Sequence, residues 1–420
     1  MTQVRKYKVL LIDVVLINLT TISFFQYSLK GNVDSAFYSY LRWAILGIWI
    51  LSLAYRLVHV KFQRHRYSTS GIIALLMLSW FTLSLIKSND LSYSLTRLAA
   101  IFALYVLGYV LIPNYYRDGS IRKAFLMSLF VGAIIFLYFG FKEHTQSLVA
   151  NFGSVRMDGE FHRAGYPAYM GVIILYVSIA VLMSNIRKSF VLRVLLLSLM
   201  VLALVTIYIT GVRTAFFSVI LIITTWLILI KRYRFSIAMA ALTVMLIILP
   251  QDIEKWYMGQ GVFSRPGADL LTGRTVRYQY AMDVFSENPL LGIGFNSEHR
   301  NFEGFSAYES FHSGYISALV ETGILGFLLF VAFVISSIGE SLRNALRYRD
   351  DWVVQFQFLF VATMALHSTV ELGLYGAGNI LILTFYILMG SQPPLERGGA
   401  HRRICYPRPN NKKSSRLSAV

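Results

Sequence analysis

Charged residues and cysteines are scarce in this sequence of 420 residues. Asp, Glu, Lys and Arg make up 14% of it, against about 25% in ordinary soluble chains. This deficit excludes a soluble enzyme and a disordered regulator. The single cysteine, Cys405, excludes a disulfide-stapled secreted module and a thiolate metal site.

Long apolar runs fill the rest of the sequence. Hydrophobic residues account for 56% of the chain, and one bilayer crossing needs about twenty of them in succession. The class indicated is an all-α polytopic membrane protein. Runs bounded by charge predict twelve transmembrane helices, at about 9–29, 40–58, 71–87, 95–112, 124–141, 165–184, 190–209, 213–230, 235–250, 314–338, 352–370 and 373–390. We expect residues 1–390 to form one integral-membrane domain and residues 391–420 to form a basic, disordered tail.

The positive charge lies mainly on one side of these spans. The net charge is +18, and most of the 39 Lys and Arg residues fall in alternate connections and in the terminal segments. Because basic residues resist translocation, that side is cytoplasmic, and both termini are expected there. The charge therefore indicates topology and contact with anionic membrane lipids, and it excludes a nucleic-acid partner.

Two outward connections are long, at about 142–164 and 251–311. Long connections in a compact protein usually exist for function, so we expect an extracytoplasmic active site. Within the second, residues 272–288 predict an amphipathic helix that ends before Pro289. Its apolar residues at helical spacing are Val276, Tyr280, Ala281, Val284 and Phe285.

Polar residues gather at the outer ends of the spans. Arg274, Arg277 and Tyr278 share one face of the predicted amphipathic helix. His312 stands at the mouth of the tenth span, after a PLLGIGFNS segment whose glycines, Gly292 and Gly294, permit a tight backbone. The short turn TGVRT places Arg213 at the outer rim of two apolar helices, where it reads equally well, taken alone, as a snorkelling anchor.

These segments follow one another in a characteristic order. RxxGxF (Arg156, Gly159, Phe161) comes first, then TGVRT, then GR before a helix ending in NPLLGIG, and last a histidine-containing entry to a span with ETGILG. Over about 150–330, this order and sidedness resemble the O-antigen polymerase and ligase family of bacterial envelope polysaccharide enzymes. The resemblance implies a metal-independent, GT-C-type glycosyltransferase of the inner membrane that takes glycan from undecaprenyl diphosphate. It also implies functional roles for Arg213, Arg274 and His312, although Ser313 stands where the family more often has Asn.

The implied chemistry suits these residue types. A lipid diphosphate leaving group gains charge as the glycosidic bond breaks, and guanidinium groups offer forked, permanently charged donors for phosphate oxygens. Arg213 and Arg274 are the candidate clamp, and Arg156, Arg277 and Tyr278 are candidate substrate-binding residues. An imidazole is largely neutral near pH 7, so His312 can take the proton of the acceptor hydroxyl. The alternative is that His312 only caps the tenth helix or binds a headgroup.

Three more ionisable residues are candidate substrate-binding residues. Glu321 lies nine residues beyond His312 and on nearly the opposite helix face, which favours an interhelical partner over a substrate ligand. His367 and Glu371, four residues apart, form a pair that either lines the cavity or is structural. We expect no metal ion and no cofactor.

The interpretation of the sequence is a surface-polysaccharide polymerase that joins lipid-linked repeat units on the outer face of the membrane. A ligase that transfers glycan to lipid A core, protein or wall polymer would use the same donor clamp, so this alternative stays open. A transporter of polysaccharide or lipid-linked sugar is the alternative from another class. The expected partners are undecaprenyl-diphosphate-linked oligosaccharide, membrane lipids, a flippase and a chain-length regulator.

Overall fold

The fold is known from a computed structural model. It describes residues 3–27, 36–59, 68–115, 120–150, 165–184, 188–210, 212–232, 237, 274–297, 311–376 and 379–390. Within these ranges all regular secondary structure is helical. The expectation of an all-α fold is confirmed.

The helices follow the predicted spans closely. In the first half they are α1 (Gln3–Tyr27), α2 (Ala36–His59), α3 (Thr69–Ser84) with η1 (Leu85–Lys87), α4 (Leu91–Tyr105) continued by η2 (Val106–Leu111) and α5 (Ile112–Tyr115), and α6 (Ser120–Ala150). In the second half they are α7 (Gly165–Met183), α8 (Phe190–Ile209), α9 (Arg213–Leu229), α11 (Arg274–Glu287), α12 (Gly314–Arg347), α13 (Trp352–His367) and α14 (Ile380–Gly390). The predicted span at 235–250 falls outside the described residues, apart from Ile237.

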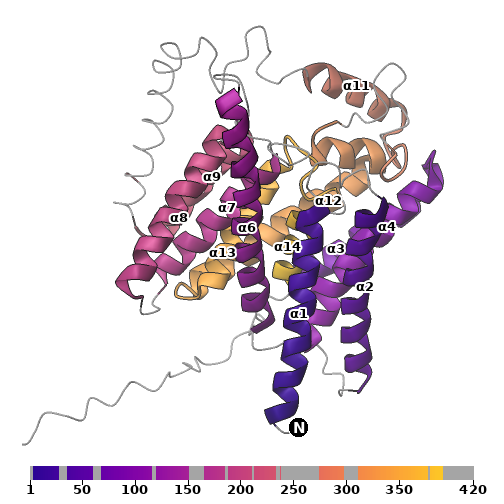
Figure 1. Ribbon diagram of the computed structural model, residues 1–420. Coiled ribbons are helices and arrows are strands. Elements are labelled where there is room, and N and C mark those ends of the chain that lie inside the picture. The colour runs from indigo at the N-terminus through magenta and orange to yellow at the C-terminus, as the bar shows by residue number, and fades with distance from the viewer. Residues whose placement is uncertain are drawn as a thin grey trace, which may run out of the picture.

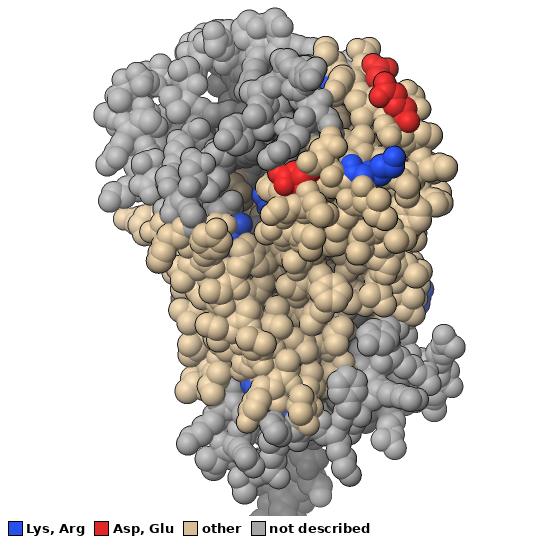
Figure 2. Space-filling view, turned by 90° about the vertical axis from the view of Figure 1, so that its right-hand side faces the viewer, with Lys and Arg blue, Asp and Glu red and all other residues tan. Residues whose placement is uncertain are grey.

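The helices have the length and surface of membrane-spanning segments. Seven helices of the described part are long and apolar enough to cross a membrane, and four shorter apolar helices accompany them. Figure 2 shows a broad, largely uncharged belt between charged residues near the two ends of the molecule. The protein is therefore a polytopic, all-α membrane protein.

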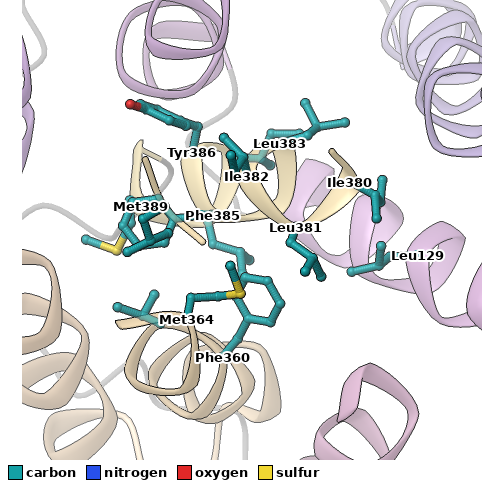
Figure 3. Close-up of a cluster of buried hydrophobic side chains, with 14 of the residues drawn as sticks. Leu129, Phe360, Met364, Ile380, Leu381, Ile382, Leu383, Phe385, Tyr386 and Met389 are labelled. Atoms are coloured by element: carbon teal, nitrogen blue, oxygen red, sulfur yellow. The ribbon is translucent and has the colours of Figure 1, made fainter. Parts of the chain in front are cut away.

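The bundle is built around α14, whose residues are all buried. Figure 3 shows α14 side chains such as Phe385 and Leu381 meeting Phe360 and Met364 of α13 and Leu129 of α6. In Figure 1, α7, α8, α9 and α13 lie on one side of the bundle and α1 to α4 on the other, with α12 and α14 between them. The helix α11 lies at the end opposite the N-terminus (Figure 1), and we call it the α11 end.

One prediction about the spans was wrong in detail. The last span was expected from residue 373, but α14 begins at Ile380, because a tight turn with Gly373 at φ +46° precedes it. Within α2, Arg56 lies in the last turns of the helix. Its guanidinium donates to both carboxylate oxygens of the buried Asp13 on α1, at 2.5 and 2.7 Å. The buried carboxylate of Asp13 is tolerated there because the half-buried guanidinium of Arg56 compensates its charge.

Candidate functional site

The helix α11 confirms the predicted amphipathic segment. Ala281 is fully buried and packs with Phe311 and Val320, which lie before and within the first turns of α12. Arg277 and Tyr278 are half-buried, and they precede Ala281 by four and three residues, so they lie on the same helix face. Val276 is 58% exposed and does not belong to this face, which corrects the predicted apolar set.

The helix α12 is interrupted at Gly323. This residue has φ +68° and ψ −175°, far from helical values. The interruption releases carbonyl groups of the preceding turn from their usual partners four residues ahead. Inside a membrane protein such groups need other donors.

The donors come mainly from residues 288–297, which follow α11 and which we call the docked loop. Three backbone hydrogen bonds join it to α12: Ile293 N to Val320 O (3.0 Å), Gly294 N to Glu321 O (2.9 Å), and Ile324 N to Pro289 O (2.9 Å). The indole of Trp80 on α3 donates to Thr322 O at 2.9 Å. The docked loop and Trp80 therefore supply hydrogen-bond partners to the backbone of α12 at its interruption.

Two glycines make this close approach possible. Gly292 has φ +69°, and a Cβ there would stand 2.5 Å from Val320 O. A Cβ on Gly323 would overlap the carbonyl of Leu290 in the docked loop and stand 2.8 Å from Leu291 N. The sequence motifs NPLLGIG and ETGILG are therefore two halves of one contact.

Aromatic packing holds the far end of the docked loop. Phe295 is buried, stacks on Phe81 of α3 with ring centroids 4.8 Å apart, and meets Tyr375 edge-on at 5.7 Å. Ser297 Oγ donates to Ser88 Oγ at 3.0 Å. The loop is thus fixed to α3 as well as to α12.

His312 lies immediately before α12 with φ +52°, a left-handed conformation that is uncommon for residues other than glycine. The N-cap of α12 is Ser313, whose hydroxyl accepts from Ile316 N. Ser and Asn are both favoured N-caps, so the departure from the family pattern at this position preserves the cap. The hydroxyl of Ser313, and not the imidazole of His312, therefore caps α12.

Glu371 stands beside His312. The distance from His312 Nδ1 to Glu371 Oε2 is 3.6 Å, and the two side chains are 26% and 34% exposed. The backbone sets this placement, because Gly314 N donates to Ser368 O (2.8 Å) and to Glu371 O (2.9 Å). The carboxylate and the imidazole therefore form a pair at the start of α12.

A second set of polar contacts, close to this pair along the chain, joins α7, α9 and α13. The hydroxyl of the buried Tyr169 on α7 contacts Nδ1 of His367 at the end of α13. Thr214 in the first turn of α9 also hydrogen-bonds to Tyr169. Glu371 N donates to His367 O at 3.0 Å, so the predicted neighbours His367 and Glu371 do lie together, each with a further side-chain contact.

Two of the candidate arginines occupy helix starts. Arg213 is the first residue of α9, directly before Thr214, and Arg274 is the first residue of α11. Their side chains, and the whole of Arg156, fall outside the part of the chain that the structure describes. Free N–H groups and the helix dipole at a helix start favour anions, so each of these helix starts suits a bound phosphate.

Glu321 occupies a different kind of position. Its side chain is fully buried, and its Oε2 accepts hydrogen bonds from Asn296 N (2.8 Å) and from the Tyr375 hydroxyl (2.6 Å). Glu321 therefore connects two other segments to α12. The sequence favoured such an interhelical role over a substrate ligand.

Sequence reasoning missed Tyr169, Thr214 and Tyr375. Tyr169 and Tyr375 lie in apolar stretches, where an aromatic residue is typical of a core. Thr214 belongs to the TGVRT segment, and its place beside Arg213 was the one available signal.

Fold and site together define a polytopic helical membrane protein. At one end of its bundle lie His312, Glu371 and two helices that begin with an arginine. Residues 198–331 match the family model described as O-antigen ligase. This match confirms the resemblance to the O-antigen polymerase and ligase family, and it includes Arg213, Arg274, His312 and the docked loop. The chain is also similar to the exopolysaccharide production protein ExoQ of Rhizobium meliloti (strain 1021), with 26% identity over 129 residues. That alignment covers 27% of this chain and 29% of the relative.

Proposed function

We propose that the protein is a membrane glycosyltransferase of the GT-C type that polymerises repeat units of a surface polysaccharide. It transfers glycan from undecaprenyl diphosphate to the acceptor sugar of another lipid-linked unit. The reaction takes place at the α11 end, which faces the outer side of the bacterial inner membrane. The observation that carries the proposal is the meeting of His312 and Glu371 at the start of α12, where α11 packs.

Arg213 and Arg274 bind the diphosphate of the donor. Each stands at a helix start, so a guanidinium and free backbone N–H groups act on the same phosphate oxygens. Arg277 and Tyr278, on the α11 face that packs toward α12, assist in binding. Fixed positive groups stabilise the charge that develops on the leaving diphosphate, so the reaction requires no metal ion or cofactor.

His312 activates the acceptor. Its Nδ1 faces Glu371, so Nε2 takes the proton from the acceptor hydroxyl as the oxygen attacks the anomeric carbon. The bond from that carbon to the diphosphate breaks, and the diphosphate leaves as an anion. Glu371 stabilises the imidazolium that results.

A ligase is the second candidate, and the description of the matching family model as O-antigen ligase favours it. It would use the same donor site and a different acceptor. A deletion strain discriminates between the two: loss of a polymerase leaves single repeat units, whereas loss of a ligase leaves long chains on the lipid carrier.

The proposal is tested with single variants in a deletion strain. Arg213→Ala, Arg274→Ala and His312→Ala are each expected to abolish the long glycan ladder while the protein still inserts in the membrane. Arg→Lys changes are expected to rescue poorly, because the guanidinium fork is lost. The matched control is Arg193→Ala, which changes an exposed arginine of α8 outside the site and should leave the ladder intact. Normal ladders from two of the three variants would discard the site assignment.

A further inference from the structure

The docked loop and the interrupted helix α12 meet at one buried carboxylate. Glu321 has no exposed side-chain surface, and its Oε2 accepts from Asn296 N at 2.8 Å and from the Tyr375 hydroxyl at 2.6 Å. A buried carboxylate is costly unless it is well hydrogen-bonded. The two hydrogen bonds to this group therefore connect the segments that donate them.

The two donors belong to different segments of the site. Asn296 ends the loop that continues α11, and Tyr375 follows Glu371 in the turn after α13. Glu321 itself lies on the same helical segment as the turn that follows His312. One carboxylate therefore connects the segment that bears the arginines, the segment that bears Glu371 and the helix that begins after His312.

The backbone at this point depends on the same carboxylate. Asn296 has φ +55°, a left-handed conformation that needs support from its surroundings. Its N–H is the group that donates to Glu321. Without this acceptor the loop loses a hydrogen bond near its end, beyond those that Ile293 and Gly294 make with α12.

We propose that Glu321 is a positioning residue that locks the docked loop and thereby holds α11 against the start of α12. Its role in the reaction rests on the proposed function, because it acts by placing the arginines of α11 relative to His312. The holding of the docked loop by Glu321 does not depend on the proposed function, and it can be measured without any substrate.

The experiment uses the full-length protein with one reporter cysteine. Cys405→Ser removes the single natural thiol, and Ser297→Cys replaces a 4% exposed serine at the end of the docked loop. The rate at which a maleimide labels this cysteine in detergent reports how often the loop leaves its site. The lock is weakened by Glu321→Gln or by Tyr375→Phe.

Two controls separate local release from general loosening. Glu340→Gln changes a second buried acid of α12, which accepts from Ser70 N at 3.1 Å and Ser70 Oγ at 2.5 Å at the other end of the bundle. A cysteine placed at Ser341, fully buried near Glu340, reports on the bundle itself.

We expect Glu321→Gln to raise labelling at Ser297→Cys by about tenfold, as for the loss of one hydrogen bond to a buried group. Glu340→Gln should leave it unchanged, and labelling at Ser341→Cys should stay slow in Glu321→Gln. Unchanged labelling in both Glu321→Gln and Tyr375→Phe would overturn the proposal, and so would an equal rise at both reporter sites.

The same variants then report on positioning. Glu321→Gln should lower the rate of glycan extension in parallel with loop release. A released loop with wild-type extension would refute the positioning role. A wild-type protein that extends no glycan would count against the proposed function, while the labelling result would still decide on the lock.

Discussion

Gly323→Ala places a methyl group at the interruption of α12, and its cost can be worked out from the structure. The backbone there has φ +68° and ψ −175°, a region populated essentially by glycine alone, which costs other residues about 1–3 kcal/mol. The new Cβ would overlap the carbonyl of Leu290, so the docked loop must move. Its three backbone hydrogen bonds to α12 would be strained or lost, at about 0.5–1.5 kcal/mol each. The expected destabilisation is about 2.5–7.5 kcal/mol.

Gly339→Ala is the matched control in the same helix. A Cβ at Gly339 would meet none of the described atoms within 4 Å, and alanine in a helix interior is favoured over glycine by about 0.5–1 kcal/mol. Thermal unfolding of the purified variants in detergent, followed by tryptophan fluorescence, measures both. We expect a clearly lower midpoint for Gly323→Ala and an equal or higher midpoint for Gly339→Ala. Equal midpoints for the two variants would refute the account of the joint between α12 and the docked loop.

Three further predictions concern the polar contacts. Glu371→Gln removes the carboxylate 3.6 Å from His312 and should slow glycan transfer by about 10- to 100-fold in a single-turnover assay; an unchanged rate would remove Glu371 from the mechanism. Tyr169→Phe removes a hydroxyl that contacts His367, and the buried groups left behind should cost about 1–3 kcal/mol of stability, seen as a lower unfolding midpoint. Asp13→Asn leaves the guanidinium of Arg56 without its charge partner, at a cost of about 3–5 kcal/mol, and adding Arg56→Met should recover most of the lost thermal stability if the pair is structural.

Most spans could be predicted from the sequence because long apolar runs have few alternatives in a membrane. The boundary of α14 could not, since a helix buried on all sides has no polar face to mark its turns. The interruption at Gly323 was also hidden. ETGILG continues an apolar pattern without a break, and only the docking of residues 288–297 shows why the helix stops there.

The candidate site also has residues that could be predicted from the sequence and residues that could not. His312 and Arg213 could be predicted as site residues because each is an ionisable residue at the outer end of an apolar span. The two partners of Glu321, Asn296 and Tyr375, could not be predicted, because spacing along a helix gives a face and not the segment that packs on it. Tyr169 was missed since one tyrosine within an apolar run has the pattern of any core residue.

The central claim is that residues at the α11 end transfer glycan from a lipid diphosphate. The direct test is to incubate the purified protein in detergent, with no ion gradient, with an undecaprenyl-diphosphate-linked oligosaccharide and to analyse the glycan by mass. The account predicts longer lipid-linked glycan and released undecaprenyl diphosphate, both absent with His312→Ala. Unaltered oligosaccharide with the wild-type protein, together with gradient-driven uptake of the same compound into proteoliposomes, would contradict it and identify a transporter.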